Sequence, residues 1–298
     1  MKAHHFETST DRTRFAVYTA GPVEAPLVLL VHGWAQSAAC WRRQLDDPSL
    51  AGELRLAAVD LRGHGCSGAP PHGYGEPARW AGDLHAVLTA ITTRPAVLVG
   101  WSYGGLVIAD YLATHGAAHT AGVLLTGAIT GIGRGVAAGR VGAVMRAALP
   151  AALAEDPRTA VPALAAFVAS MTARPMHGAD EQAMLAAALA TPPHVRAALF
   201  DRHADGAQLV AALSRQPRPV LVQHGAEDRV VDRDTATHHL ASIPGAEADW
   251  WAGTGHLPFV EDPARFNRTL LHFARHCAKI GERAKNGERA KNGERMAR

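Results

Sequence analysis

Short apolar runs alternate along this chain with stretches that have the spacing of amphipathic helices. The runs cover residues 27–31, 54–59, 96–99, 122–125 and 220–222. Such Val- and Leu-rich runs are typical of strands that are buried on both faces of a sheet. The helix-like stretches cover residues 77–91, 103–114, 232–240 and 263–276. This alternation predicts an α/β fold, with a mostly parallel sheet and helices on both of its faces.

The two segments before the first apolar run have a different pattern. Residues 4–7 and 15–19 are polar and alternating, as in an exposed antiparallel edge. At 298 residues, the chain is long enough to bury one large core. We therefore expect a core domain made of residues 1–130 and 206–278.

Residues 131–205, called here the inserted segment, contain no strand-like run. They are rich in alanine, have apolar residues at helical spacing and contain six prolines. We expect several short helices that form a lid inserted into the core domain.

The last residues, 279–298, include the hexapeptide Gly-Glu-Arg-Ala-Lys-Asn twice in succession. Because Asn-Gly recurs and no large apolar residue occurs in the repeat, we expect this tail to be disordered. Residues 281–298 also carry the whole formal net charge of +3. A basic surface that could follow phosphates is therefore not expected on the folded part, and we predict no nucleic-acid partner.

The cysteines and the N-terminus indicate the cellular compartment of the protein. Cys40, Cys66 and Cys277 are odd in number and lack CxxC spacing, which favours a reducing compartment over a disulfide framework. The N-terminus has no apolar signal-peptide core, and no run of about 18 apolar residues occurs. We expect a cytoplasmic protein that does not associate with membranes.

The strongest chemical motif is Gly100-Trp101-Ser102-Tyr103-Gly104, which fits G-x-S-x-G. It follows a strand-like run and precedes a helix-like stretch, as a nucleophile elbow requires. In such a turn the serine has a strained backbone and stands at a helix N-terminus above the strand ends. A glycine-rich turn with a capping serine is the plainer alternative. We predict that Ser102 is a nucleophile.

A serine hydroxyl needs a base, and His256 is the candidate among 17 histidines. It stands in Gly253-Thr254-Gly255-His256-Leu257-Pro258, directly after the strand-like residues 248–251. The alternative is a surface loop histidine. Because the loops after strand ends carry catalytic groups in α/β folds, we favour the role of general base.

The base needs a carboxylate on its other nitrogen, which fixes the tautomer and stabilises the imidazolium. Asp228 follows the strand-like run at 220–222 and completes the chain order Ser, Asp, His. Glu227 and Asp232 are rivals, although a solvated loop charge and a helix N-cap are simpler roles for them. We predict Asp228 as the third member.

Acyl transfer also requires donors for an oxyanion. We expect one from the backbone N–H of Tyr103 and one from that of Trp34, in the loop after residues 27–31. The Trp34 ring and Leu257 are expected to contact the substrate. His32 is expected to bond to the neighbouring loop, and the glycine-rich residues 60–68 to form a rigid turn held by Asp60 and Arg62.

We expect no cofactor. No cluster of side chains has the spacing of metal ligands, residues 60–68 lack the Gly-Lys-Ser/Thr end of a P-loop, and no GxGxxG opens a βαβ unit.

With these motifs in place, residues 13–276, the inserted segment excepted, resemble the α/β-hydrolase superfamily. The resemblance rests on His-Gly-Trp at 32–34, Asp-Leu-Arg-Gly-His-Gly at 60–65, the elbow, Gly-Ala-Glu-Asp at 225–228 and Gly-Thr-Gly-His at 253–256. The chain looks most similar to bacterial serine esterases related to cofactor-free haloperoxidases, or perhydrolases. That resemblance implies a triad at Ser102, Asp228 and His256 and an oxyanion amide at Trp34.

The resemblance also separates related activities. The elbow serine argues against haloalkane dehalogenases and epoxide hydrolases, which have aspartate there. The loop at 32–37 lacks the Gly-Pro-Gly pattern of the meta-cleavage C–C hydrolases, which disfavours that activity.

The sequence thus predicts serine-dependent hydrolysis of a small-molecule carboxylic ester. Three alternatives stay open: perhydrolysis or another acyl transfer, C–C bond hydrolysis, and a ligand-binding receptor on a hydrolase scaffold.

Overall fold

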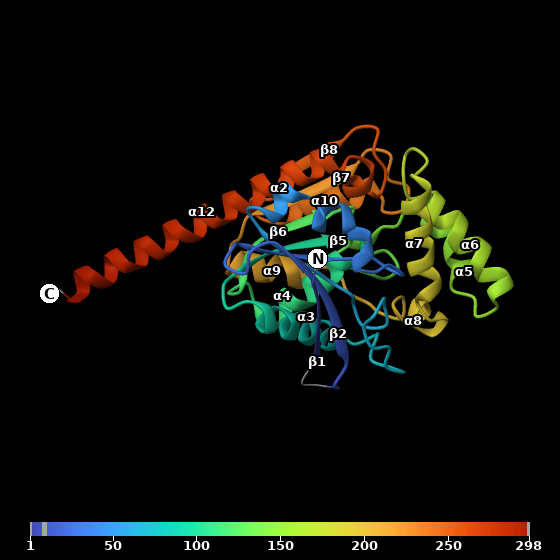
Figure 1. The fold of residues 1–298 in the computed structure, drawn as a ribbon, viewed down its shortest axis with the longest axis horizontal. Coiled ribbons are helices and arrows are strands. Elements are labelled where there is room, and N and C mark those ends of the chain that lie inside the picture. Colours follow the sequence, from blue (N-terminus) through green and yellow to red (C-terminus); the bar gives the residue numbers. More distant parts are fainter. Residues whose placement is uncertain (1, 8–10, 297–298) are drawn as a thin grey trace.

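The computed structural model describes residues 2–7 and 11–296, and within them eight strands form one sheet in the order β1-β2-β4-β3-β5-β6-β7-β8 (Figure 1). Strand β2 pairs antiparallel with both β1 and β4, and every other neighbouring pair is parallel. The predicted α/β fold, with its antiparallel edge, is confirmed. The strands are β1 (Lys2–Glu7), β2 (Arg14–Ala20), β3 (Leu27–Val31), β4 (Arg55–Val59), β5 (Ala96–Trp101), β6 (Thr120–Thr126), β7 (Val220–Gly225) and β8 (Glu247–Trp251).

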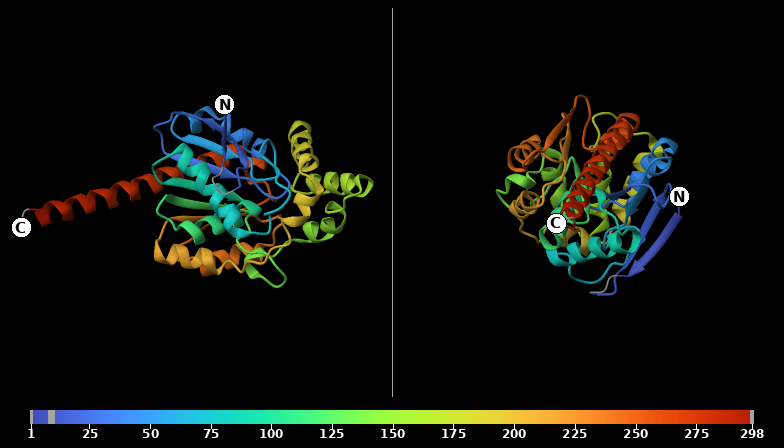
Figure 2. Two further views of the ribbon diagram at one scale, coloured as in Figure 1. Left: turned by 90° about the horizontal axis from the view of Figure 1, so that it is seen from below. Right: turned by 90° about the vertical axis from the view of Figure 1, so that its left-hand side faces the viewer.

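Helices cover both faces of this sheet (Figures 1 and 2). On one face α4 (Tyr103–His115) packs between α3 (Pro77–Ile91) and α9 (Ala207–Arg215). On the other face α12 (Pro263–Met296) lies against β6. Because both faces are covered, every residue of β3 and β5 is buried, which explains why these strands read as unbroken apolar runs.

The predicted element bounds agree closely where the pattern is strong. The strand at residues 27–31 and the helix at residues 77–91 have the predicted bounds. Helix α9 and several short helical turns were not predicted, because their apolar pattern is too short to stand out. These turns and the remaining core helix are η1 (Ala38–Trp41), α1 (Arg42–Leu45), α2 (Pro48–Ala51), α10 (Arg233–Ser242) and α11 (Pro258–Glu261).

The inserted segment leaves the core after β6 and returns before β7, and it contains helices without a named strand. An isolated antiparallel bridge between Ile132 and Ala204 joins its two ends. Its helices are η2 (Ala137–Gly139), α5 (Ala143–Ala152), α6 (Pro157–Ala169), α7 (Gly178–Ala190) and α8 (Pro193–Ala198). Figure 1 shows the four α-helices of this segment gathered at one end of the molecule, beyond the sheet, whereas its 3-10 helix η2 packs against α10 of the core.

The expectation of a disordered tail at 279–298 needs correction. Helix α12 continues to Met296 and projects away from the core (Figure 2), whereas residues 297–298 lie outside the described part. The first turns of this helix are anchored by buried Phe266, Leu270 and Phe273. Extending an existing helix needs no new nucleus, and Glu, Arg, Ala and Lys are good helix formers. The Asn-Gly pairs therefore do not end the helix.

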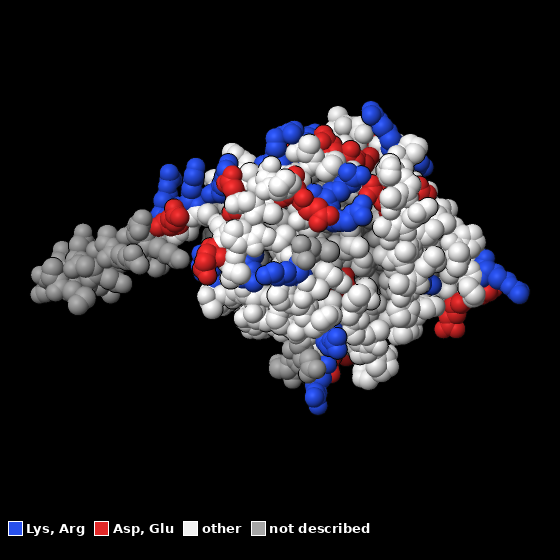
Figure 3. Space-filling model, in the orientation of Figure 1, with Lys and Arg blue, Asp and Glu red and all other residues white. Residues whose placement is uncertain are grey.

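On the face shown in Figure 3, Lys and Arg side chains are interspersed with Asp and Glu. Among the described residues, no helix is both long and apolar enough to cross a membrane.

The three cysteines form no disulfide bond with one another: Cys40, Cys66 and Cys277 are all free thiols.

Candidate active site

Ser102 occupies the sharp turn between β5 and α4. Its backbone has φ 52° and ψ −120°, in the region that L-residues rarely adopt. The flanking glycines are required by close packing. A Cβ on Gly104 would lie 2.4 Å from the carbonyl oxygen of Val31, and one on Gly100 would lie 2.8 Å from the nitrogen of Gly105. The structure thus has the strained strand–turn–helix that the motif predicts.

Asp228 and His256 meet above the ends of neighbouring strands β7 and β8. The Nδ1 of His256 lies 2.8 Å from Oδ2 of Asp228. The other oxygen, Oδ1, accepts from the backbone N–H groups of Val230 and Val231, at 2.8 and 3.0 Å. Both side chains of the pair are at most 1% exposed. The carboxylate of Asp228 therefore holds the buried imidazole of His256 in one orientation.

The charge of Asp228 is stabilised despite its burial. Burial alone raises the pKa of this carboxyl, but His256, through its charge and its hydrogen bond, and the amide of Val231 hold the pKa below the usual value. Asp228 is therefore ionised at neutral pH, as an acceptor for the Nδ1–H of His256 must be.

The rival carboxylates have other positions. Asp232 is the N-cap of α10, where its side chain accepts from the backbone N–H of Asp234 at 3.0 Å. Glu227 is exposed. Of the three acids considered from the sequence, the structure brings only Asp228 to His256.

The elbow and the histidine loop are joined by a hydrogen bond from a side chain to the backbone. The indole Nε1 of Trp101 donates to the carbonyl oxygen of His256 at 3.0 Å. The amide of Ser102 donates to Thr126 at 3.3 Å, and a Cβ on the next residue, Gly127, would lie 3.0 Å from Nδ1 of His256. Ser102 and the imidazole therefore border the same short segment at the end of β6.

Within the described chain, the hydroxyl of Ser102 forms no hydrogen bond, either with the imidazole of His256 or with any other group. In free enzymes such catalytic bonds are often long and tighten only with substrate.

The two predicted oxyanion donors face no recorded acceptor. Among the described residues, neither the amide of Trp34 nor that of Tyr103 donates a hydrogen bond. A Cβ on Gly33 would lie 2.9 Å from Cβ of Ser102, so the loop that carries Trp34 abuts the elbow. An amide pair without acceptors beside a serine is the arrangement that an oxyanion hole needs.

The side chain of Trp34 contacts the inserted segment. Its Nε1 donates to the carbonyl oxygen of Arg196 at 3.0 Å, and its ring packs edge-on against Phe167 and Phe200, each at 5.6 Å. Leu257 is fully buried. The predicted substrate contacts of both residues stay predictions.

The glycine-rich residues 60–68 form the rigid turn that we expected. Asp60 accepts from the amides of Ala38 and Cys66 at 2.7 and 2.8 Å, and Arg62 forms two hydrogen bonds with Asp83. The Nε2 of His32 accepts from the amide of Leu61 at 3.0 Å, which confirms its structural role.

A buried cluster behind the elbow was not found by sequence reasoning. Arg202, at the end of the inserted segment, donates to the hydroxyl of Tyr103 at 3.0 Å and to Asp110 at 2.6 Å. The Tyr103 hydroxyl in turn donates to the carbonyl oxygen of Leu199 at 3.2 Å. These contacts tie the returning end of the inserted segment to the helix of the nucleophile. No local motif signals them, since the partners are distant in sequence.

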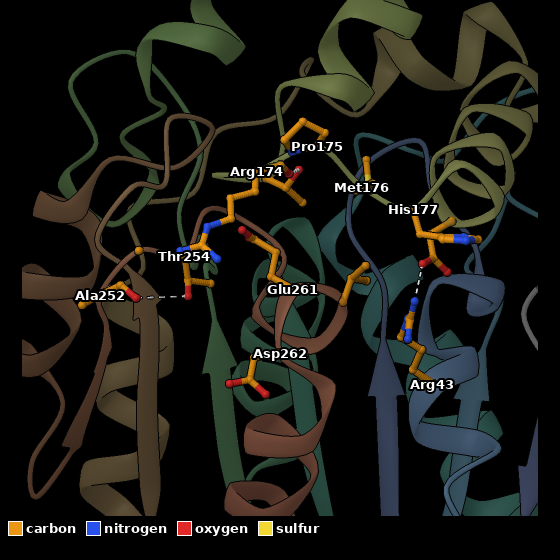
Figure 4. Close-up of a pocket in the computed structure, with 13 residues that line it drawn as sticks. Arg43, Arg174, Pro175, Met176, His177, Ala252, Thr254, Glu261 and Asp262 are labelled. Atoms are coloured by element: carbon orange, nitrogen blue, oxygen red, sulfur yellow. Dashed lines mark hydrogen bonds and ion pairs between the residues drawn. The ribbon is translucent and has the colours of Figure 1, made fainter.

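Within the part of the chain that the structure covers, no group of three or more His, Cys, Asp or Glu side chains is arranged to hold a metal ion. A cavity of about 440 Å³ lies beside the loop of His256, between that loop and residues 172–177 of the inserted segment (Figure 4).

The fold and this site define an enzyme of the hydrolase class, and the chain belongs to the alpha/beta hydrolase family, whose model matches residues 28–269. Its similarity to individual proteins is also clear. An esterase from Rhodococcus sp. ECU1013 has 45% sequence identity and a TM-score of 0.85, with 92% of this chain and 99% of that chain covered.

Two curated relatives have different activities in their names. The pimeloyl-[acyl-carrier protein] methyl ester esterase of Nitrosospira multiformis is 27% identical, covering 87% of this chain and 98% of the relative. The non-heme chloroperoxidase of Streptomyces lividans is 28% identical, covering 90% and 98%. The predicted resemblance to esterases related to haloperoxidases is thereby confirmed, and this enzyme is of the esterase type.

Proposed function

We propose that this enzyme hydrolyses small carboxylic esters through an acyl-enzyme on Ser102. The observation that carries the proposal is the buried 2.8 Å pair of His256 and Asp228 beside a strained elbow serine. An ionised, hydrogen-bonded carboxylate keeps Nδ1 protonated, which leaves Nε2 of His256 as the basic nitrogen.

The reaction follows from these roles. Ser102 Oγ attacks the ester carbonyl carbon while His256 Nε2 takes the hydroxyl proton, and the amides of Trp34 and Tyr103 stabilise the oxyanion. Collapse of the tetrahedral intermediate breaks the C–O bond, and the imidazolium returns the proton to the leaving alcohol. His256 then deprotonates a water that attacks the acyl-enzyme, and the imidazolium gives this proton to Ser102 Oγ as the acid is released.

The inserted segment supports a preference for apolar groups. Phe167 and Met171 are buried in it, near Trp34 and the loop of His256 respectively. We infer that this segment acts as a lid over Ser102 and that apolar or aromatic acyl or alcohol groups bind beneath it. Names of relatives agree with an ester substrate.

A panel of p-nitrophenyl esters with wild type and Ser102→Ala tests the proposal. We expect the variant to lose several orders of magnitude in kcat, because triad members act as a unit. Ser49→Ala, at an exposed serine, is the control and should keep full activity. A fluorophosphonate probe should label wild type at Ser102 and should not label Ser102→Ala. Equal turnover by Ser102→Ala and wild type would refute the role of this serine.

Perhydrolysis is the second candidate, favoured by the similarity to a non-heme chloroperoxidase. In that reaction hydrogen peroxide replaces water as the acyl acceptor and yields a peracid. Comparing peracid formation with acid release from the same ester, over a range of peroxide concentrations, separates the two activities.

A further inference from the structure

Glu261 is the last residue of the short helix α11, five positions after the candidate base. Its side chain forms part of the wall of the cavity of about 440 Å³. Figure 4 shows it rising from α11 toward Thr254 and the chain that carries Arg174 and Pro175. The site proposed above gives this carboxylate no chemical task.

Both oxygens of Glu261 accept from backbone amides that belong to different parts of the molecule. Oε1 accepts from Gly255, next to His256, at 2.8 Å. Oε2 accepts from Ala173, in the connection between α6 and α7, at 2.8 Å. One charged group thus bridges the histidine loop and the inserted segment, with hydrogen bonds of the stronger, charge-assisted kind.

A second link runs parallel to this bridge. The backbone amide of His256 donates to the carbonyl oxygen of Met171 at 2.7 Å. The approach requires glycine at 255, because a Cβ there would lie 2.8 Å from both the Met171 oxygen and the Ala173 nitrogen. With Trp101 bonded to its carbonyl oxygen, His256 has both backbone polar groups held.

We propose that Glu261 is a positioning residue for His256, which couples the seating of the inserted segment to the orientation of the imidazole. This inference rests on the proposed esterase function. Removal of the carboxylate leaves the amides of Gly255 and Ala173 without an acceptor, so the loop loses its fixed position against residues 171–173. The imidazole then reaches the Ser102 proton less often, while Trp34 and Phe167, which share no hydrogen bond with Glu261, keep their contact with each other.

Glu261→Gln and Glu261→Ala test this role, with Glu227→Gln as the matched control on an exposed acid next to Asp228. Gln keeps one acceptor oxygen, whereas Ala keeps none. For p-nitrophenyl ester hydrolysis we expect kcat to fall in the order wild type, Gln, Ala, by on the order of 10- to 100-fold for Ala, as small misplacements of catalytic groups do. KM should stay within about twofold, and Glu227→Gln should match wild type.

The Nδ1–H proton resonance of His256, observed by NMR at low temperature, is the second readout. It should be sharp in wild type and in Glu227→Gln, and broadened or shifted in both Glu261 variants. If the Glu261 variants are less stable to heat but keep kcat and this resonance, the positioning role is wrong and the carboxylate is structural only. If wild type and Ser102→Ala both fail to hydrolyse any ester, the proposed function fails instead, and the resonance still tests Glu261.

Discussion

The indole nitrogen of Trp101 donates a hydrogen bond of 3.0 Å to the backbone carbonyl oxygen of His256. Trp101 directly precedes the elbow serine, and its ring centroid lies 5.4 Å from that of the imidazole. The residue that ends β5 therefore fixes the loop that follows β8, although 155 positions separate the two in sequence.

Replacing Asp228 by Asn tests the assignment of the carboxylate. The Asn oxygen can still accept from Val230 and Val231, so the loop keeps its shape, but the amide group no longer favours a protonated Nδ1. We expect kcat for ester hydrolysis to fall by about 10⁴-fold, as in other triads. Asp232→Asn is the control. Asp232 caps helix α10 and does not contact His256, so this variant should keep the kcat of wild type. A large loss of kcat in Asp232→Asn with none in Asp228→Asn would reverse the assignment.

Acid should destabilise the fold through its buried histidines. Burial lowers the pKa of His32 to about 4 and the pKa values of His64 and His239 to about 3. In the unfolded chain such groups titrate near 6.5, so between pH 6.5 and about 4 the unfolded chain binds more protons. The free energy of unfolding therefore falls as pH falls through this window, by on the order of 3 kcal/mol for each group.

Urea unfolding of His239→Gln at pH 7 and pH 5 checks the effect. The variant should lose less stability than wild type between the two pH values, because one such histidine is gone. His276→Gln, at an exposed position, should lose as much as wild type. The same loss in all three proteins would show that His239 does not contribute.

The ion pair of Arg202 and Asp110 should matter far more to stability than one at the surface. Its partners are 2.6 Å apart, with side chains 1% and 6% exposed. Asp110→Asn leaves a buried guanidinium without its counter-charge, so we expect the free energy of unfolding to fall by about 3–5 kcal/mol. Asp234→Asn breaks the exposed pair with Arg140 and should cost at most about 1 kcal/mol. Similar losses in urea titrations of both variants would contradict this prediction.

The elbow shows how far local sequence reaches. Glycines at 100 and 104 around Ser102, between an apolar run and a helical pattern, were enough to predict a strained turn, because the motif and its flanking patterns lie within a few residues. The close packing that requires glycine is local at 100, where the neighbour is Gly105, but at 104 it involves Val31 of the adjacent strand β3. The alternation of apolar runs and helical stretches likewise predicted the parallel sheet, because burial on both faces leaves its mark on each strand separately.

The repeat at the C-terminus shows where local reasoning failed. Its composition predicted disorder, yet α12 continues through it, because the turns before it are anchored on the core and propagation is easier than nucleation. The state of a weakly patterned segment thus depends on what precedes it.

Sequence alone determined the sheet, the elbow and the three side chains proposed for catalysis, since each of these depends on patterns within one strand, turn or loop. Only the tertiary structure decided that Trp101 and Glu261 hold the histidine loop, and that Arg202 reaches Tyr103 and Asp110. Trp101 and His256 lie 155 positions apart, and Arg202 lies 99 and 92 positions from Tyr103 and Asp110, so these contacts depend on how the strands and the inserted segment are brought together. The type of a side chain determines which groups it can bind, whereas the tertiary fold determines which groups lie within its reach.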